Sequence, residues 1–458
     1  MDPQHRNIVI IGGGVMGCTT AYFLSRHPKF DPALHTITLL EAATIAAGAS
    51  GKAGGLLGLW AYPQCLVPLS YRLHRELAEE HDGAERWGYR RVEAGSVGAV
   101  VKSADLKSRP DQRDVQPAIS APANSTPQSP AGGLPIQSIL SEEAKPKDWE
   151  KLPKQDEKAA GLLTASPLPP DLDWINADLI NHYEEMGAAG LSDTAQVHPF
   201  HFTNAMADLA REKGVVIKIG AKVVKINQTK AGVQSVEYED RSETLAGTGT
   251  ATNRFVHGVT DVVVTAGPWT GRLLPRSKIE TLRAHSVVYE ANISPFAVFT
   301  DIQLPTDYVP EHRASKGQKR KHRGNVDPEI YSRPGNEVYA CGEPDSSVPL
   351  PETADLVQCD EAQCDDLIAY IGTISPVLGA APIKAKQACY LPRHMRFGEE
   401  RSPLIGQTSV PGLWLAAGHT CWGIQNGPGT GYLMAELLLD GVAKSADIGV
   451  LDPKKFKV

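Results

Sequence analysis

Short apolar runs alternate with helix-like segments along most of the chain. Four runs of mainly β-branched and aliphatic residues lack polar alternation, which is typical of strands buried on both faces of a sheet: residues 7–11, 36–40, 261–265 and 412–416. Helical patterns occupy residues 16–27 and 66–80. A third helix opens at His198 and Pro199, because proline suits a first helical turn. This alternation predicts an α/β domain.

Other strand patterns predict a separate sheet. Residues 286–289, 330–332 and 337–341 look like its strands, and residues 89–101 also have a strand pattern. The basic stretch 316–323 is interpreted as a solvated hairpin loop, with a nuclear signal or an interaction patch as the alternative. Residues from about 107 to 158 are rich in Pro, Ser, Ala and Lys and have no sustained periodicity, so we interpret them as a partly disordered surface insertion.

A glycine motif of the form G-x-G-x-x-G directly follows the first apolar run. It consists of Gly12, Gly14 and Gly17, with Val15 and Met16 between the last two glycines. In this setting Gly12 makes the tight turn, Gly14 lets the backbone approach a pyrophosphate, and Gly17 lets the helix pack on the strand. Phosphate charge then meets the N-terminus of the helix. The motif predicts a dinucleotide site, which FAD and NAD share.

Glu41 ends the second apolar run, where its carboxylate is placed to accept hydrogen bonds from a ribose diol. A stretch of small residues follows, including Ser50, Gly51, Gly55 and Leu56. Such a stretch is either a flexible connector or a segment whose backbone contacts a long flat ligand. We predict the second alternative. We therefore assign Glu41, Ser50, Gly51, Gly55 and Leu56 to the cofactor site.

A second unit of strand, glycine loop and helix lies near the end of the chain. Gly418, Trp422, Gly423 and Ile424 fall between the strand pattern 412–416 and a helix that continues to Gly441. The free N–H groups of that helix suit a flavin N1/C2 carbonyl, which becomes negative on reduction. The alternative is an ordinary glycine-punctuated start of a helix. This second loop favours FAD over NAD.

Two more segments complete the predicted cofactor contacts. Ala266, Gly267 and Trp269 follow the strand pattern 261–265, and glycine there lets a ligand come close. Val224 lies in a predicted strand at residues 222–226. We expect these residues to contribute to the same site.

The charge and the cysteine content of the chain limit the classes of ligand and partner that we expect. The chain has 46 Lys and Arg against 53 Asp and Glu, a net charge of −7, which gives no electrostatic reason to expect nucleic acid or anionic lipid. Seven scattered cysteines without a CxxC pair suggest neither a disulfide framework nor a metal site. With no signal-peptide pattern and no apolar run of membrane-spanning length, we expect a soluble, cytoplasmic protein with a small-molecule partner.

Together these blocks resemble the FAD-dependent oxidoreductases of the D-amino-acid oxidase, glycine oxidase and sarcosine oxidase family, most closely a fungal branch of it. The resemblance implies an α/β plus α+β fold. A Rossmann-like FAD-binding domain would be assembled discontinuously from residues 1–85, 196–275 and 385–458. A mixed-sheet substrate domain, also discontinuous, would comprise residues 86–195 and 276–384 and cover one face of the flavin.

The resemblance also implies the chemistry. Family members oxidise the C–N bond of an amine or amino acid by passing hydride to flavin N5, which needs no side-chain base, and we assign none. The alternative function is a flavin-stabilised trafficking or regulatory protein with little or no turnover. An arginine that the family often has is replaced here by Leu391, with Arg393 and Arg396 out of register. The sequence does not decide between an oxidase and a dehydrogenase.

Tyr331 and Arg333 are the predicted substrate-binding residues, since they project from one face of a strand that the resemblance places near the substrate cavity. Arg333 would either hold a substrate carboxylate or pair on the surface with Glu337 or its neighbours.

The resemblance further raises a covalent flavin link through Cys389, with Lys386 or Arg393 lowering the pKa of the thiol. Cys421 is placed at the opposite edge of the flavin, too far away to form the link. We favour noncovalent FAD.

Overall fold

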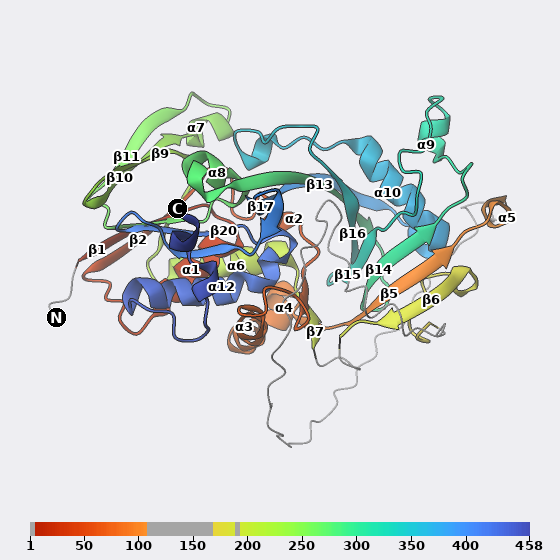
Figure 1. Cartoon of the computed structure of the whole chain (residues 1–458), viewed down its shortest axis with the longest axis horizontal. Helices are drawn as coiled ribbons and strands as arrows, with labels where there is room; N and C mark the ends of the chain where they lie inside the picture. Colours follow the sequence, from red (N-terminus) through yellow and green to blue (C-terminus); the bar gives the residue numbers. More distant parts are fainter. Residues whose placement is uncertain (1–4, 108–167, 188–192) are drawn as a thin grey trace, which may run out of the picture.

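Figure 1 shows the computed structural model, which describes residues 5–107, 168–187 and 193–458. The predicted insertion at 107–158 lies, apart from its first residue, outside the described residues. Two large sheets dominate the described chain, and the segments that build each of them are far apart in sequence (Figure 1).

The first sheet has six strands in the order β19-β20-β12-β1-β2-β8. All neighbouring pairs are parallel except β19 with β20. In chain order the strands are β1 (Arg6–Ile11), β2 (His35–Glu41), β8 (Val216–Ile219), β12 (Asp261–Val264), β19 (Leu404–Gln407) and β20 (Leu413–Ala417). The four apolar runs predicted as buried strands all lie in this sheet.

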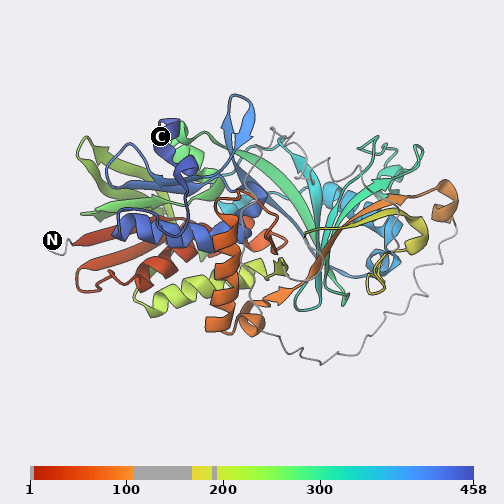
Figure 2. The same ribbon diagram turned by 60° about the horizontal axis from the view of Figure 1, so that its bottom comes forward.

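Helices cover one face of this sheet, and a small antiparallel sheet covers the other (Figure 2). Ile8 and Ile10 of β1 pack into the helical side, whereas Val9 and Ile11 pack on the opposite side. Because both faces are buried, the strand needs no polar alternation. The helices are α1 (Val15–Arg26), α3 (Val67–Glu80), α6 (Pro199–Glu212) and α12 (Gly423–Leu439); the small sheet contains β9 (Ala221–Thr229), β10 (Gly232–Asp240) and β11 (Thr252–His257).

The second large sheet has eight strands in the order β18-β17-β13-β16-β15-β14-β5-β6. It is mixed, because β5 pairs in parallel with β14 while the other neighbours are antiparallel. Its strands are β5 (Glu93–Val100), β6 (Ile180–Glu185), β13 (Ile279–Glu290), β14 (Phe296–Gln303), β15 (Glu329–Arg333), β16 (Glu337–Asp345), β17 (Ile383–Arg396) and β18 (Glu399–Arg401). The basic stretch 316–323 lies in the mostly exposed connection between β14 and β15.

The faces of the second sheet have different roles. Helix α10 (Glu361–Ile374) packs on one face through Cys364 and Ile371, which join the cluster containing Val287 and Ile330. The opposite face presents Tyr331 and other side chains toward the first sheet. The boundary expected at residue 385 falls inside β17, which pairs with β13 along its length.

Candidate functional site

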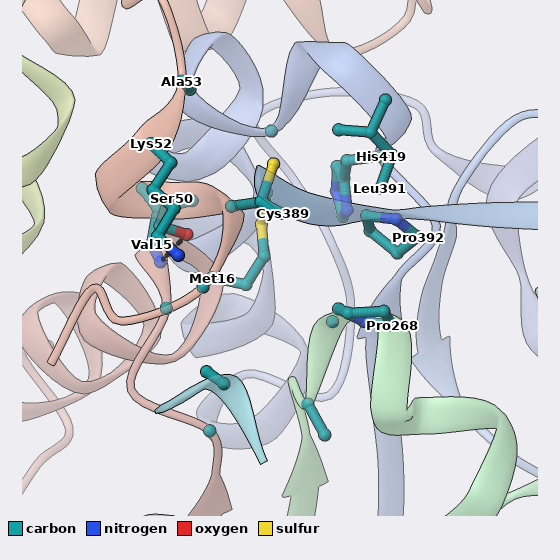
Figure 3. Close-up of a pocket in the computed structure, with 18 of the residues that line it drawn as sticks. Val15, Met16, Ser50, Lys52, Ala53, Pro268, Cys389, Leu391, Pro392 and His419 are labelled. Carbon is teal, nitrogen blue, oxygen red and sulfur yellow. Dashed lines mark hydrogen bonds between the residues drawn. The ribbon is translucent and has the colours of Figure 1, made fainter. Parts of the chain in front are cut away.

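A cavity of about 390 Å³ runs between the two large sheets. Its walls come from the turn after β1, the loop at residues 47–56, β9, the loop after β12, strands β13 to β17, and the loop after β20. Figure 3 shows side chains from two of these walls, Ser50 and Lys52 from the short helix α2 (Ala49–Lys52) and Cys389 and Leu391 from β17, around one space. This size is within the range of small-molecule and cofactor sites.

The glycine turn after β1 admits no side chains at two positions. Gly12 has φ +110°, and a Cβ there would lie 2.6 Å from the Thr265 carbonyl oxygen. A Cβ on Gly17 would lie 1.9 Å from the carbonyl oxygen of Gly12. The backbone of the turn and the first turn of α1 therefore pack directly on each other, as the motif predicts.

Ser50 joins the small-residue loop to this turn. Its hydroxyl accepts a hydrogen bond of 2.9 Å from the amide of Val15, the first residue of α1. No acidic side chain stands in the first turn of α1 itself. Gly14 and Ser50 both line the cavity beside that helix end.

Glu41 links the glycine turn to the segment after β2. One carboxylate oxygen accepts a hydrogen bond from the amide of Gly13, and the other accepts one from the amide of Ala43, each at 2.7 Å. Burial raises the pKa of Glu41, while these backbone hydrogen bonds oppose the rise. The side chain lines the cavity, and a carboxylate can accept about four hydrogen bonds. It therefore keeps acceptor capacity for a ligand.

The loop after β20 forms the facing wall. Trp422, Gly423 and Ile424 line the cavity, and α12 starts at Gly423 without a side-chain cap. His419 lies in the same loop, buried, with its Nε2 3.0 Å from the Thr430 hydroxyl. Burial lowers the pKa of His419 to about 3, so its ring is neutral at physiological pH.

The structure brings together most residues that the sequence analysis named for the cofactor. Those lining the cavity are Gly12, Gly14, Val15, Met16, Glu41, Ser50, Gly55, Leu56, Val224, Ala266, Gly267, Trp269, Cys389, Trp422, Gly423 and Ile424. Gly17, Gly51 and Gly418 lie outside the lining. They shape the backbone: a Cβ on Gly51 would lie 2.2 Å from the Ala46 carbonyl oxygen, and Gly418 has φ +91°.

Tyr331 and Arg333 lie in different surroundings in the structure. Tyr331 lines the cavity, whereas Arg333, 5% exposed, lies outside its lining. The Arg333 guanidinium donates to the Ala53 carbonyl, approaches the Glu337 carboxylate at 3.5 Å, and lies 4.5 Å from the centre of the Tyr339 ring. The pairing interpretation therefore fits this arginine better than carboxylate binding, although the pair is buried and not on the surface.

Cys389 lines the cavity, and burial raises the pKa of its thiol to about 11. The expected cationic neighbours are engaged elsewhere: Lys386 with Asp365 at 2.7 Å and Arg393 with Glu400 at 2.8 Å.

The charge that acts on Cys389 comes instead from Lys52, whose Nζ donates to the carbonyl of Ala388 at 2.9 Å. Cys421 also lines the cavity, with its sulfur 3.6 Å from the Tyr62 hydroxyl oxygen, and burial raises the pKa of its thiol.

The sequence analysis missed several lining residues of the second sheet, among them Phe299, Glu329, Tyr339 and Cys341. Glu329 lies two residues before Tyr331 on the same strand, and residues two apart on a strand project from one face. Glu329 could therefore have been found from the sequence. Tyr339 and Cys341 depend on the pairing register of β15 with β16, which no local pattern reveals.

The comparisons with known proteins agree with this arrangement. A family model described as "FAD dependent oxidoreductase" matches residues 7–437. The chain is 35% identical over 515 residues to "Putative oxidoreductase TDA3" of Saccharomyces cerevisiae, covering 98% of this chain and 95% of that protein.

Among solved structures, the fold is similar to those of two enzymes. Glycine oxidase from Bacillus cereus has a TM-score of 0.59 and 18% identity, over 97% of this chain and 99% of that one. L-proline dehydrogenase from P. horikoshii has a TM-score of 0.60 and 14% identity, over 99% and 98%. Within the described residues, no helix combines the length and apolar character needed to cross a bilayer.

Proposed function

Because the chain belongs to the family of FAD-dependent oxidoreductases, we propose that it oxidises a C–N bond of a small amine or amino acid. The observation that carries the proposal is the single cavity that extends from the glycine turn of the first sheet to the aromatic face of the second. The similarity of the fold to a glycine oxidase and a proline dehydrogenase supports this substrate class.

The residues that line the cavity fit FAD. Gly12 and Gly14 line the cavity beside the N-terminus of α1, where their backbone would approach the diphosphate. Glu41 would accept hydrogen bonds from the adenosine ribose. The Trp422 amide donates to the His419 carbonyl at 3.0 Å, so the amides of Gly423 and Ile424 are the ones that would donate to the flavin pyrimidine edge.

The protein's own part in the reaction is to bind and orient. When bound, FAD supplies the hydride acceptor, N5, and the imine product hydrolyses in water. Aromatic side chains such as Phe299 and Tyr339 line the cavity and give it an apolar wall on which the carbon chain of a substrate would pack. His419 is neutral and held by Thr430, so we assign it no proton-transfer role.

We also propose that FAD is bound without a covalent link. With its pKa raised to about 11, the thiol of Cys389 is protonated at neutral pH, whereas attachment needs a thiolate. All flavin should leave the polypeptide on acid denaturation. Flavin that stays with the wild-type chain but leaves a Cys389→Ala variant would contradict this.

The proposed activity is tested by mixing the purified protein anaerobically with a panel of amines and amino acids. A substrate should bleach the visible flavin absorption, and admitting oxygen afterwards distinguishes an oxidase from a dehydrogenase. A flavin that no member of a broad panel reduces would contradict the proposed function.

A further inference from the structure

Two cysteines meet where helix α10 begins. The sulfurs of Cys359 and Cys364 lie 3.5 Å apart, within hydrogen-bond distance for two thiols. Asp360 caps α10, since its carboxylate accepts a hydrogen bond from the amide of Ala362 at 3.1 Å. Cys359 is therefore the residue before the cap and Cys364 the fourth helical residue, two positions whose side chains often pack together at the start of a helix. The chain has no CxxC pair, so this spacing becomes informative only once the start of α10 is known.

Strand β13 holds both thiols in place. Three polar contacts join their surroundings to neighbouring residues of this strand: the Arg283 guanidinium donates to the Gln358 carbonyl at 3.0 Å, the Asp360 amide donates to the His285 ring at 3.1 Å, and the Cys364 sulfur lies 3.7 Å from the Ser286 carbonyl oxygen. The backbone on each side of Cys359 is thus bonded to the strand on which Cys364 packs. The two sulfurs are kept close without a covalent link.

The two thiols differ in exposure and in acidity. Cys359 is partly exposed, whereas Cys364 is fully buried. The hydrogen bond from Cys364 lowers the pKa of Cys359 and Lys52 assists, while burial and the carboxylates of Glu361 and Asp360 oppose the shift. Hydrogen bonding to Cys359 and burial raise the pKa of Cys364. An accessible thiolate beside a second thiol is typical of cysteines that oxidants modify.

We propose that Cys359 and Cys364 form a redox-active pair that hydrogen peroxide converts to a disulfide at the start of α10. The Cys359 thiolate attacks one peroxide oxygen, so that an S–O bond forms and the O–O bond breaks; the other oxygen leaves as hydroxide and takes up a proton. The Cys364 sulfur then attacks the sulfenic acid, the S–S bond forms, and the hydroxyl group leaves with the Cys364 proton as water. The two sulfurs together lose two electrons, and the peroxide is reduced to two molecules of water.

The test is peptide mapping of the reduced, flavin-loaded, full-length protein after brief treatment with hydrogen peroxide. Remaining thiols are alkylated in denaturant. Cleavage after Lys, Arg and Glu then places Cys359 on peptide 353–361 and Cys364 on peptide 362–384, and neither peptide contains another cysteine. In most molecules we expect these peptides to be joined, with a mass lower by two hydrogen atoms than their sum, and to separate on reduction with dithiothreitol.

Variants assign the two roles. Cys364→Ser should give no joined peptide and should leave Cys359 as a sulfenic acid that dimedone traps. Cys359→Ser should leave Cys364 as a free, alkylated thiol. Cys65→Ser is the matched control, because Cys65 is also partly exposed but burial raises the pKa of its thiol, and this variant should form the joined peptide as wild type does. Flavin retention and circular dichroism verify that each variant is folded, and the wild-type measurement does not depend on them.

Three results from peroxide-treated, native wild type would overturn the inference: both cysteines recovered as free thiols, a disulfide that joins either of them to another cysteine, or Cys359 oxidised beyond the sulfenic acid with no joined peptide. A contact that serves only as packing at the start of the helix gives the first result. Neither cysteine lines the cavity, and the mapping needs no turnover, so failure of the proposed function would leave this test unaffected.

Discussion

Each charged side chain that lines the cavity has a hydrogen-bond partner within the described chain. Glu41 is the clearest case, since both of its carboxylate oxygens hold backbone amides, those of Gly13 and Ala43. The charge is thus fixed in place before any ligand arrives, and little reorganisation is needed on binding.

Replacing Glu41 with Ala should weaken retention of FAD about tenfold or more, because two charge-assisted hydrogen bonds that order the turn are lost together with the ribose acceptor. The molar ratio of FAD to protein after gel filtration measures the effect. Glu76→Ala on the exposed face of α3 serves as the control. Unchanged FAD occupancy in the Glu41 variant would count against a ribose site at this residue.

The surroundings of Glu337 lead to a second prediction, which concerns how the stability of the fold changes at acidic pH. The His198 ring at 3.3 Å and Lys384 at 2.5 Å, with opposing burial, lower the pKa of Glu337 from 4.5 to about 2. Because the pKa is lower in the folded state, the stabilisation is present above pH 4.5 and is lost as pH falls toward 2.

In wild type, the urea concentration at the unfolding midpoint should fall as the pH is lowered from 4.5 to about 2. This fall should be smaller in Glu337→Gln. Glu290→Gln is the control, since that side chain is exposed. A variant whose midpoint declines with pH as steeply as wild type would show that Glu337 does not couple protons to folding.

At the residue level, the sequence brought together candidate site residues where the chemistry is local. The turn glycines, Glu41 and Ser50 are close in sequence and their roles follow from one strand, turn and helix. Arg333 was ambiguous because its partners, Ala53 and Glu337, are set by long-range packing and by strand register.

At the level of elements, α1 packs closely on the turn before it. Gly17→Ala should displace α1, since the new Cβ would lie 1.9 Å from the backbone carbonyl oxygen of Gly12. We expect a loss of about 1–3 kcal/mol in unfolding free energy, together with loss of FAD. Thermal melts followed by flavin fluorescence and circular dichroism measure both.

Gly372→Ala in α10 is the matched control. Its new Cβ would make only an ordinary contact, 3.6 Å from the Gly379 Cα, and alanine favours a helix. If Gly17→Ala melts and retains FAD like this control, the close approach of helix and turn is not needed for cofactor binding.

Elements of the first sheet were predictable because burial on both faces leaves unbroken apolar runs, as in β1 and β12. Strand β17 was not predicted, because it alternates poorly and carries Lys384, Lys386 and Pro392. The parallel pairing of β5 with β14 joins segments about 200 residues apart, a register that no local propensity encodes.

At the scale of the whole molecule, the cavity exists only because two sheets built from interleaved segments face each other (Figure 2). The first sheet contributes the glycine turn and Glu41, and the second contributes the aromatic face with Glu329. The resemblance to a flavoprotein family predicted this division in outline. It did not predict the residues of the second wall, which come together through tertiary pairing.

The most direct test of this account is a crystal structure of the protein with its bound cofactor. The account predicts FAD density with the diphosphate at Gly12 and Gly14, and with the flavin pyrimidine edge within hydrogen-bond distance of the amides of Gly423 and Ile424. The flavin ring should face Tyr331 across the cavity. A flavin bound outside this cavity, or amides of Gly423 and Ile424 that lie beyond hydrogen-bond distance from the ring, would contradict it.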